Sequence, residues 1–159
     1  MPRSRQEIID AHNAVTERLA AAASGLSEED LARTVYEGWP VKDVLCHLAS
    51  GSAAGAFFIA IARSGRQGPD AGFDLDRWNQ DRVAERRSKP VRDLVAEFRA
   101  GHEASIKALH EAPDELLAQE VQSDVGVTLL ADMLYITAAE HDAGHLDDLE
   151  RALGRHGEA

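Results

Sequence analysis

The sequence predicts an all-α domain built as a four-helix bundle, with short extra helices in its connections. Four long segments carry apolar residues at helical spacing, and no stretch alternates apolar and polar residues as a half-buried strand would. Aromatic residues make up only 5% of the chain, whereas a β-sandwich favours aromatic and β-branched residues. With 159 residues, the chain fits a single domain over residues 1–159.

The charge and composition bear on the partners and the compartment. The chain has 17 Lys and Arg against 28 Asp and Glu residues, a formal net charge of −11. Because a field of that sign repels phosphate backbones and anionic lipid, we expect no nucleic-acid partner and no membrane partner. No apolar run approaches the ~20 residues of a membrane span, and the N-terminus has no apolar signal core. With Cys46 as its single cysteine, the chain is expected to be cytoplasmic.

Local start and stop signals define the first long helix. Ser4, followed three residues later by Glu7, predicts a capping box at its N-terminus. Gly25 is suited to end this helix in a left-handed conformation. Ser27 then begins a short helical turn that we expect to reach about residue 32.

A second long helix is predicted over residues 40–64. The tripeptide Gly-Trp-Pro at residues 38–40 precedes it, and proline suits the first turn, where its missing N–H leaves no hydrogen bond unmade. Gly51 and Gly55 lie on its apolar stripe. They allow a neighbouring helix to approach closely, which opposes a propensity cost of roughly 1 kcal/mol for each glycine.

Two further long helices complete the predicted bundle. The segments are, in order, a glycine-rich loop at 65–73, a polar helix over 74–87, a helix from Lys89-Pro90 to Pro113, a turn and a QSDVG loop at 114–126, and a helix over 128–153. Asp74 and Thr128 are expected to be N-caps. The long connection before the third helix is compatible with a crossover, and the order of the helices in space stays open.

Three histidines lie on predicted core faces. His141 and His145 continue the apolar stripe of the helix over 128–153, and they project from one face because they are four residues apart. His47 lies on the stripe of the helix over 40–64. Imidazoles so placed can bind one ion, at ~2.0–2.1 Å per nitrogen for zinc. A site with three such ligands would keep its fourth position for water or substrate.

Plainer interpretations of these residues stay open. A single histidine on an apolar face is more often a core residue bonded to a carbonyl than a ligand. Cys46 adjoins His47, points about 100° away from it and is interpreted as a small core residue. The other histidines are interpreted as a core or rim residue (His12), borderline positions on the third long helix (His102 and His110) and a solvated tail position (His156).

Several carboxylates flank the three histidines in the sequence. Asp43 comes one turn before the first histidine, and Glu140, Asp142 and Asp148 surround the other two. Metal-bound histidines usually donate their other N–H to a carboxylate or a carbonyl, so these four are candidates to hold the ligands in place. The alternative, which we favour for at least two of them, is a solvated acidic face. Trp39 is a candidate for the mouth of a pocket, or else packs between helices.

Two segments resemble signatures of the DinB/YfiT-like superfamily. The run GWPVKDVLCHLA at residues 38–49 resembles its second-helix signature, in which a histidine follows a tryptophan by eight residues. The run EHDAGHLDDL at residues 140–149 resembles its last-helix signature, HxxxHL. The resemblance covers essentially the whole chain. It implies an up-down-down-up four-helix bundle and a divalent metal, commonly zinc or nickel, held by His47, His141 and His145.

Within this superfamily the first run looks closest to two groups. One comprises the N-terminal domain of mycothiol-dependent maleylpyruvate isomerase and related thiol S-transferases, and the other is the ClbS/DfsB-like group, associated with protection from a reactive genotoxin. This chain is about one domain long, so we expect no extra C-terminal domain such as the isomerase has.

The resemblance implies a metal-dependent thiol transferase or hydrolase acting on a small electrophilic molecule, with mycothiol or bacillithiol as a cosubstrate. A metal held by three neutral histidines would lower the pKa of a bound water or thiol. The alternative is a non-catalytic metal-containing protein that binds a small molecule or protects against a toxin. The alanine-rich helix faces and Trp78 also suggest a homodimer.

Overall fold

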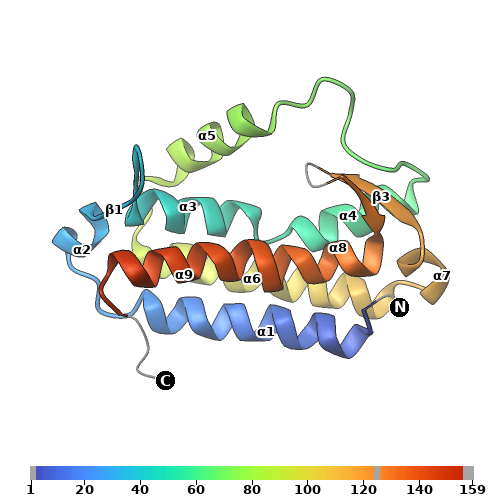
Figure 1. The fold of residues 1–159 in the computed structure, drawn as a ribbon, viewed down its shortest axis with the longest axis horizontal. Coiled ribbons are helices and arrows are strands. Elements are labelled where there is room, and N and C mark those ends of the chain that lie inside the picture. The colour runs from blue at the N-terminus through green and yellow to red at the C-terminus, as the bar shows by residue number, and fades with distance from the viewer. Residues whose placement is uncertain (1–2, 124–125, 156–159) are drawn as a thin grey trace.

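Four long helical segments pack around a common core in the computed structural model, which describes residues 3–123 and 126–155 (Figure 1). The segments are α1 (Arg5–Ala22), α3 with α4 (Val41–Gly51 and Ala54–Arg63), α6 (Val91–Glu111), and α8, η1 and α9 (Leu130–Ile136, Thr137–Asp142 and Ala143–Ala152). The first segment packs against the third and the fourth, and the second segment also packs against the third and the fourth, so that every long segment contributes to the core. The predicted four-helix bundle is confirmed.

The four segments run up, down, down and up. Figure 1 shows α1 and α8–α9 running in one direction, and α3–α4 and α6 running in the other. Two consecutive parallel segments need a long connection, which residues 64–90 supply as they return along the bundle with α5 (Leu75–Arg86). The long connection is therefore a crossover, which is what the superfamily resemblance implied.

Short strands and helices occupy the remaining connections. The strands form two antiparallel pairs, β1 (Thr34–Tyr36) with β2 (Trp39–Pro40) and β3 (Glu120–Ser123) with β4 (Gly126–Leu129). The short helices are α2 (Glu28–Ala32) and α7 (Asp114–Leu117).

The expectation that the chain has no strand is wrong, because strands this short show no alternation. Thr128 lies in β4 instead of capping a helix, and Leu129 is the N-cap of α8. Residues 124–125 of the expected QSDVG loop lie outside the described residues.

The helix predicted over residues 40–64 is two helices, because the chain turns at residues 52–53 where α6 crosses it. A Cβ on Gly101 of α6 would lie 2.0 Å from Oγ of Ser52. The hydroxyl of Ser52 is buried and donates to the carbonyl oxygen of Ala49 at 2.8 Å. The sequence displays the small residues that permit the crossing, but the position of the break depends on the partner helix.

The last long segment contains a π-helical stretch, η1, that was not predicted. Wider turns of this kind are rare and frequently occur at functional sites. Within η1, Asp142 is only 4% exposed, whereas 47% of the side chain of His141 is exposed. The predicted core position of His141 is therefore wrong, because a stripe counted at 3.6 residues per turn does not hold through a π-helical turn.

Residues Val41–Arg63 are long and apolar enough to cross a membrane, with a mean hydropathy of 1.8. This differs from the expectation above that no apolar run approaches the length of a membrane span. In the structure, 56% of this window is buried inside the bundle, as the core helix of a helical protein would be. The absence of a membrane partner stays a prediction.

The predicted capping box of α1 is formed. The Ser4 hydroxyl accepts from the backbone N–H of Glu7 at 3.2 Å, and the Glu7 carboxylate accepts from the backbone N–H of Ser4 at 2.9 Å. Replacing Ser4→Ala is expected to lower the free energy of unfolding by ~1 kcal/mol, measured by urea denaturation. The control Ser88→Ala, at an exposed serine between α5 and α6, should change it by less than ~0.5 kcal/mol. Equal losses in the two variants would contradict the role of the cap.

Candidate metal centre

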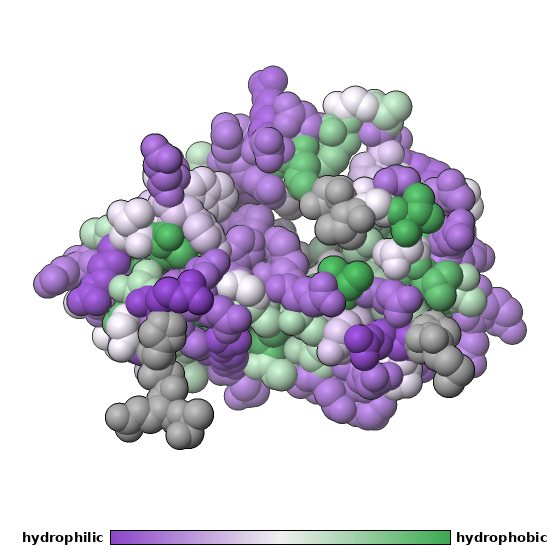
Figure 2. All heavy atoms as spheres, viewed as in Figure 1, coloured by the Kyte–Doolittle hydropathy of each residue, from purple (hydrophilic) through white to green (hydrophobic). Residues whose placement is uncertain are grey.

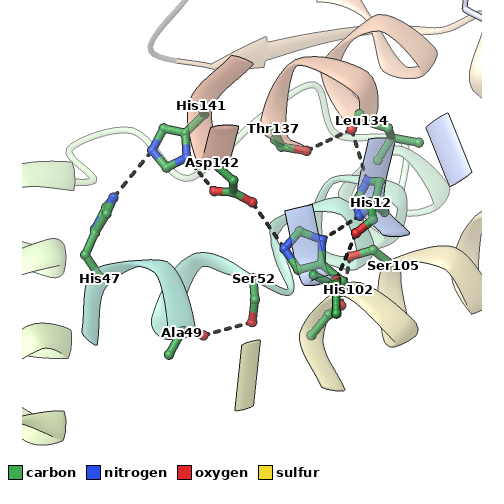
Figure 3. Close-up of polar contacts among 12 residues, drawn as sticks. His12, His47, Ala49, Ser52, His102, Ser105, Leu134, Thr137, His141 and Asp142 are labelled. Atoms are coloured by element: carbon green, nitrogen blue, oxygen red, sulfur yellow. Dashed lines mark hydrogen bonds and ion pairs between the residues drawn. The ribbon is translucent and has the colours of Figure 1, made fainter. Parts of the chain in front are cut away.

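Three histidine side chains from two of the four long segments meet at one place in the bundle. His47 projects from α3, His141 from η1 and His145 from α9, and one ring nitrogen of each lies within 4.8 Å of the others. Nε2 of His47 and Nε2 of His141 are 3.4 Å apart, and Figure 3 shows these two rings pointing toward each other. We call these three residues the histidine cluster.

The spacing of the histidine cluster fits a divalent metal ion. A tetrahedral ion with nitrogen ligands at ~2.0–2.1 Å separates neighbouring ligand atoms by about 3.3 Å, close to the 3.4 Å between the two Nε2 atoms. The ring centroids lie 4.7, 4.8 and 5.3 Å apart, and all three ring pairs are tilted or edge-on. The rings therefore converge through their edges, which carry the nitrogen atoms.

The electrostatic environment favours the neutral forms of His47 and His145. Burial, together with the neighbouring His145 and His141, lowers the pKa of His47 to about 4. Burial and the neighbouring His141 also lower the pKa of His145. Since the neutral imidazole is the form that binds a metal, these shifts favour ligation near pH 7.

Tyr36 holds His145 in a fixed orientation. Its hydroxyl donates to Oδ2 of Asp148 at 2.7 Å and lies 2.9 Å from Nδ1 of His145. Because the single hydroxyl hydrogen goes to the carboxylate, the hydroxyl oxygen accepts from Nδ1–H of His145. This arrangement leaves Nε2 of His145 without a proton and available as a ligand. Burial and the bond to Asp148 raise the pKa of Tyr36.

Asp142 holds His141 in the same manner. Nδ1 of His141 donates to Oδ1 of Asp142 at 2.8 Å, so that Nε2 of His141 faces His47 (Figure 3). Burial alone would raise the pKa of Asp142, but hydrogen bonds from His102 and His141 outweigh it and the pKa is lowered. The imidazole of His141 is thus oriented by an ionised carboxylate.

The other two candidate carboxylates are not brought to the histidines. Asp43 accepts two hydrogen bonds from the guanidinium of Arg87, at 3.0 and 2.8 Å. Glu140 is exposed to solvent. Glu140 therefore fits the solvated alternative, whereas Asp43 is buried and paired with Arg87. Asp142 and Asp148 are the two that support the cluster.

Trp39 borders the cluster and also packs against the hydrophobic core, so the pocket-mouth role and the packing role both stay open. Its half-buried ring lies 5.6 Å, between centroids, from the ring of His47. Cys46 is fully buried in the hydrophobic core. The remaining histidines are buried (His12 and His102), exposed (His110) and outside the described residues (His156).

Tyr36 and His102 were missed as partners of the candidate site. Tyr36 is 109 residues from His145 in the sequence and lies on a strand that was not predicted. The one relevant signal in the sequence is Trp39-Pro40, which follows Tyr36 and marks the start of the second long helix. His102 was seen as a borderline core position, without a partner.

One side of the histidine cluster is open to solvent. The side chain of His141 is 47% exposed, whereas His47 is 7% exposed. Figure 1 shows α5 lying across α3, and Figure 2 shows the molecule hollowed between this layer and the bundle. A structural zinc site is closed, whereas a catalytic one keeps a position open for water or substrate. The cluster resembles the open kind.

An up-down-down-up helical bundle that carries such a histidine cluster identifies a protein of the DinB/YfiT-like superfamily. More narrowly, the chain belongs to the family of mycothiol maleylpyruvate isomerase N-terminal domains, whose model matches residues 12–150. None of the curated proteins compared with the chain matches it.

Two solved structures have a similar fold. YfiT from Bacillus subtilis, described as a probable metal-dependent hydrolase with an unusual four-helix bundle topology, has a TM-score of 0.75 and 17% sequence identity, and the match covers 98% of this chain and 94% of YfiT. Mycothiol-dependent maleylpyruvate isomerase has a TM-score of 0.75 and 15% identity, over 92% of this chain and 61% of the isomerase. This chain thus spans less than two thirds of the isomerase. At these identities the likeness establishes the fold.

Proposed function

We propose that this protein is a divalent-metal-dependent enzyme whose His47, His141 and His145 bind the metal. The enzyme activates a thiol or water for transfer to, or hydrolysis of, a small electrophilic molecule. The observation that carries the proposal is the convergence of three imidazoles within 4.8 Å. Hydrogen bonds to Nδ1 hold two of these imidazoles, those of His145 and His141. Solvent reaches the cluster at the His141 side chain, which is 47% exposed.

A divalent ion bound by three neutral histidines keeps its full positive charge and lowers the pKa of a bound water or thiol toward neutrality. The residues of this chain supply the geometry. Tyr36 and Asp142 set which nitrogen of His145 and His141 faces the cluster. Trp39 borders His47 and limits the direction from which a small molecule can approach.

We propose zinc or nickel as the metal and mycothiol or bacillithiol as the thiol. The thiol is supported by the family, which takes its name from a mycothiol-dependent enzyme. Hydrolysis by water is supported by the likeness to YfiT. The isomerase reaction itself is not proposed, because the match covers 61% of that enzyme.

Metal analysis tests the shared premise of both reactions. Protein purified without an affinity tag is expected to contain zinc or nickel, or to take up either ion. A chain that holds no divalent metal and takes up neither ion would refute the proposal.

Assays of small electrophiles with mycothiol, with bacillithiol, with glutathione and without thiol then distinguish transfer from hydrolysis. A bound metal with no activity in any of them would favour a non-catalytic binding or protection protein.

A Tyr36→Phe variant is expected to weaken the affinity for zinc about tenfold, because Nδ1–H of His145 loses its acceptor while the ring stays in place. Competition with a chromophoric chelator measures this affinity. Tyr135→Phe is the matched control, since the Tyr135 ring packs under Arg3, with 4.1 Å between guanidinium carbon and ring centroid. Wild-type affinity in Tyr36→Phe would contradict the orienting role of the hydroxyl.

We propose from composition and charge that the protein is cytoplasmic and has no nucleic-acid or membrane partner. We propose a homodimer from the alanine-rich helix faces and Trp78. Trp78, which prompted the homodimer, is half-buried on α5 with its ring centroid 6.4 Å from that of Phe73. Light scattering of the purified protein would measure the mass of the assembly, and a monomer at micromolar concentration would argue against the homodimer.

A further inference from the structure

The three rings of the histidine cluster are not all held in the same way. Nδ1 of His141 donates to the carboxylate of Asp142. Nδ1 of His145 is bonded to the hydroxyl of Tyr36. Nδ1 of His47 is buried and makes no hydrogen bond within the described part of the chain. The orientation of the His47 ring is therefore left to the side chains packed around it.

The ring that borders His47 from outside the cluster belongs to Trp39. The two ring centroids are 5.6 Å apart, and the ring planes are nearly perpendicular, at 82°. An edge-on contact is a preferred arrangement of aromatic rings, so it favours one relative orientation of the pair. Because Trp39 is half-buried and also packs against the hydrophobic core, its own ring is restrained.

Trp39 shares a hairpin with the residue that orients another ligand. Tyr36 and Trp39 lie opposite each other in the antiparallel pair of β1 and β2. Trp39 contacts His47 of the second long segment, whereas Tyr36 contacts His145 of the fourth. The hairpin thus touches one histidine on each of the two segments that carry the cluster. Because a short turn links the two side chains, a shift of the hairpin would displace both contacts together.

The hairpin is also attached to both segments through groups other than the histidines. The backbone N–H of Val41, at the start of α3, donates to the carbonyl oxygen of Arg33 at 2.8 Å. On the other side, the Tyr36 hydroxyl donates to Asp148 of α9 at 2.7 Å. Gly38 forms the turn with a φ of 74°, in the left-handed region where any residue with a Cβ is strained. The shape of the turn therefore depends on this glycine.

We propose that the β1–β2 hairpin positions two ligands of the metal centre, and that Trp39 is the positioning residue for His47 as Tyr36 is for His145. A ligand that is already held in place loses less freedom when the metal binds, so the hairpin strengthens metal binding. This effect on affinity rests on the proposed function. The orientation of the His47 ring by Trp39 does not require a metal.

The orientation is tested on the metal-free protein by NMR relaxation of the ring C–H groups, with the His47 signals assigned by their loss in His47→Gln. The order parameter of the His47 ring is expected to be about 0.8 in the wild type and to fall below about 0.6 in Trp39→Leu. The His145 ring keeps its bond to Tyr36 and should not change. A His47 ring that is equally rigid in folded Trp39→Leu overturns the proposal, whether or not the protein binds a metal.

Zinc affinity, measured by chelator competition on variants that circular dichroism finds folded, tests the consequence for the metal. Trp39→Leu is expected to weaken the affinity about tenfold. Trp39→Phe keeps an aromatic ring beside His47 and should stay within about threefold of the wild type. The matched control is Trp78→Leu, at the tryptophan of α5, which should bind zinc like the wild type.

Wild-type affinity in folded Trp39→Leu, or equal losses with leucine and phenylalanine, overturns the positioning role. A wild type that takes up no zinc refutes the proposed function instead, and the order parameters then decide whether Trp39 holds His47.

The turn is tested by Gly38→Ala against Gly65→Ala. The two glycines have φ values of 74° and 75°, and a Cβ on either meets nothing within 4 Å, so both alanines introduce the same local strain. Gly38→Ala shifts the hairpin and should weaken zinc binding by about threefold to tenfold, whereas Gly65→Ala should leave it unchanged. Equal affinities in the two folded variants overturn the role of the hairpin. If Trp39→Leu does not fold, this pair decides.

Discussion

Replacing His145→Ala is expected to abolish the binding of zinc or nickel. The variant keeps two of the three proposed ligands, and it also loses the group that Tyr36 orients. Two imidazoles do not form the three-histidine set from which a catalytic zinc site is built. Mass-spectrometric metal analysis after dialysis should fall from about one ion per chain to none. Any metal-dependent activity should be lost with it.

The control for this variant is His110→Ala, which removes an exposed histidine from α6, outside the histidine cluster. Its metal content should match that of the wild type. Circular dichroism of metal-free samples checks that His145→Ala keeps its helices. An unchanged stoichiometry in folded His145→Ala would refute the ligand assignment, whatever the activity of the protein.

A second large effect is expected at the crossing of α6 with the break between α3 and α4. In Gly101→Ala, the new Cβ would lie 2.0 Å from Oγ of Ser52 and 2.7 Å from its carbonyl carbon. A side chain can rotate away, but the backbone atom cannot, so the two helices must separate. We expect the free energy of unfolding to fall by ~3 kcal/mol, measured by urea denaturation.

Gly144→Ala is the matched control, because Gly144 also lies within a helix but a Cβ there meets nothing within 4 Å. This variant should gain ~0.5–1 kcal/mol of stability, since alanine has the higher helix propensity. Adding Ser52→Gly to Gly101→Ala removes the contact with Oγ but not the one with the carbonyl carbon. The double variant should recover only part of the lost free energy of unfolding. Wild-type stability in the single variant Gly101→Ala would contradict the close packing of the two helices.

The ends of several helices could be predicted because their signals are local. The Ser4 capping box and the cap at Asp74, which accepts from the backbone N–H of Arg77, both act within one turn of the chain. The break at residues 52–53 and the π-helical stretch η1 could not be predicted. The break lies where α6 crosses, and a π-helical turn changes the period on which the pattern is read.

The three histidines of the candidate centre could be chosen from spacing and resemblance, because each lies in a recognisable segment of its own helix. Their supporting partners could not. Tyr36 and His145 are 109 residues apart, and His12 and His102 are 90 residues apart. Of the four carboxylates within one helical turn of a histidine in the sequence, Asp142 and Asp148 are the two that the structure brings to the cluster. A hydrogen bond requires atoms about 3 Å apart, and only the packing of whole helices decides which distant side chains reach that distance.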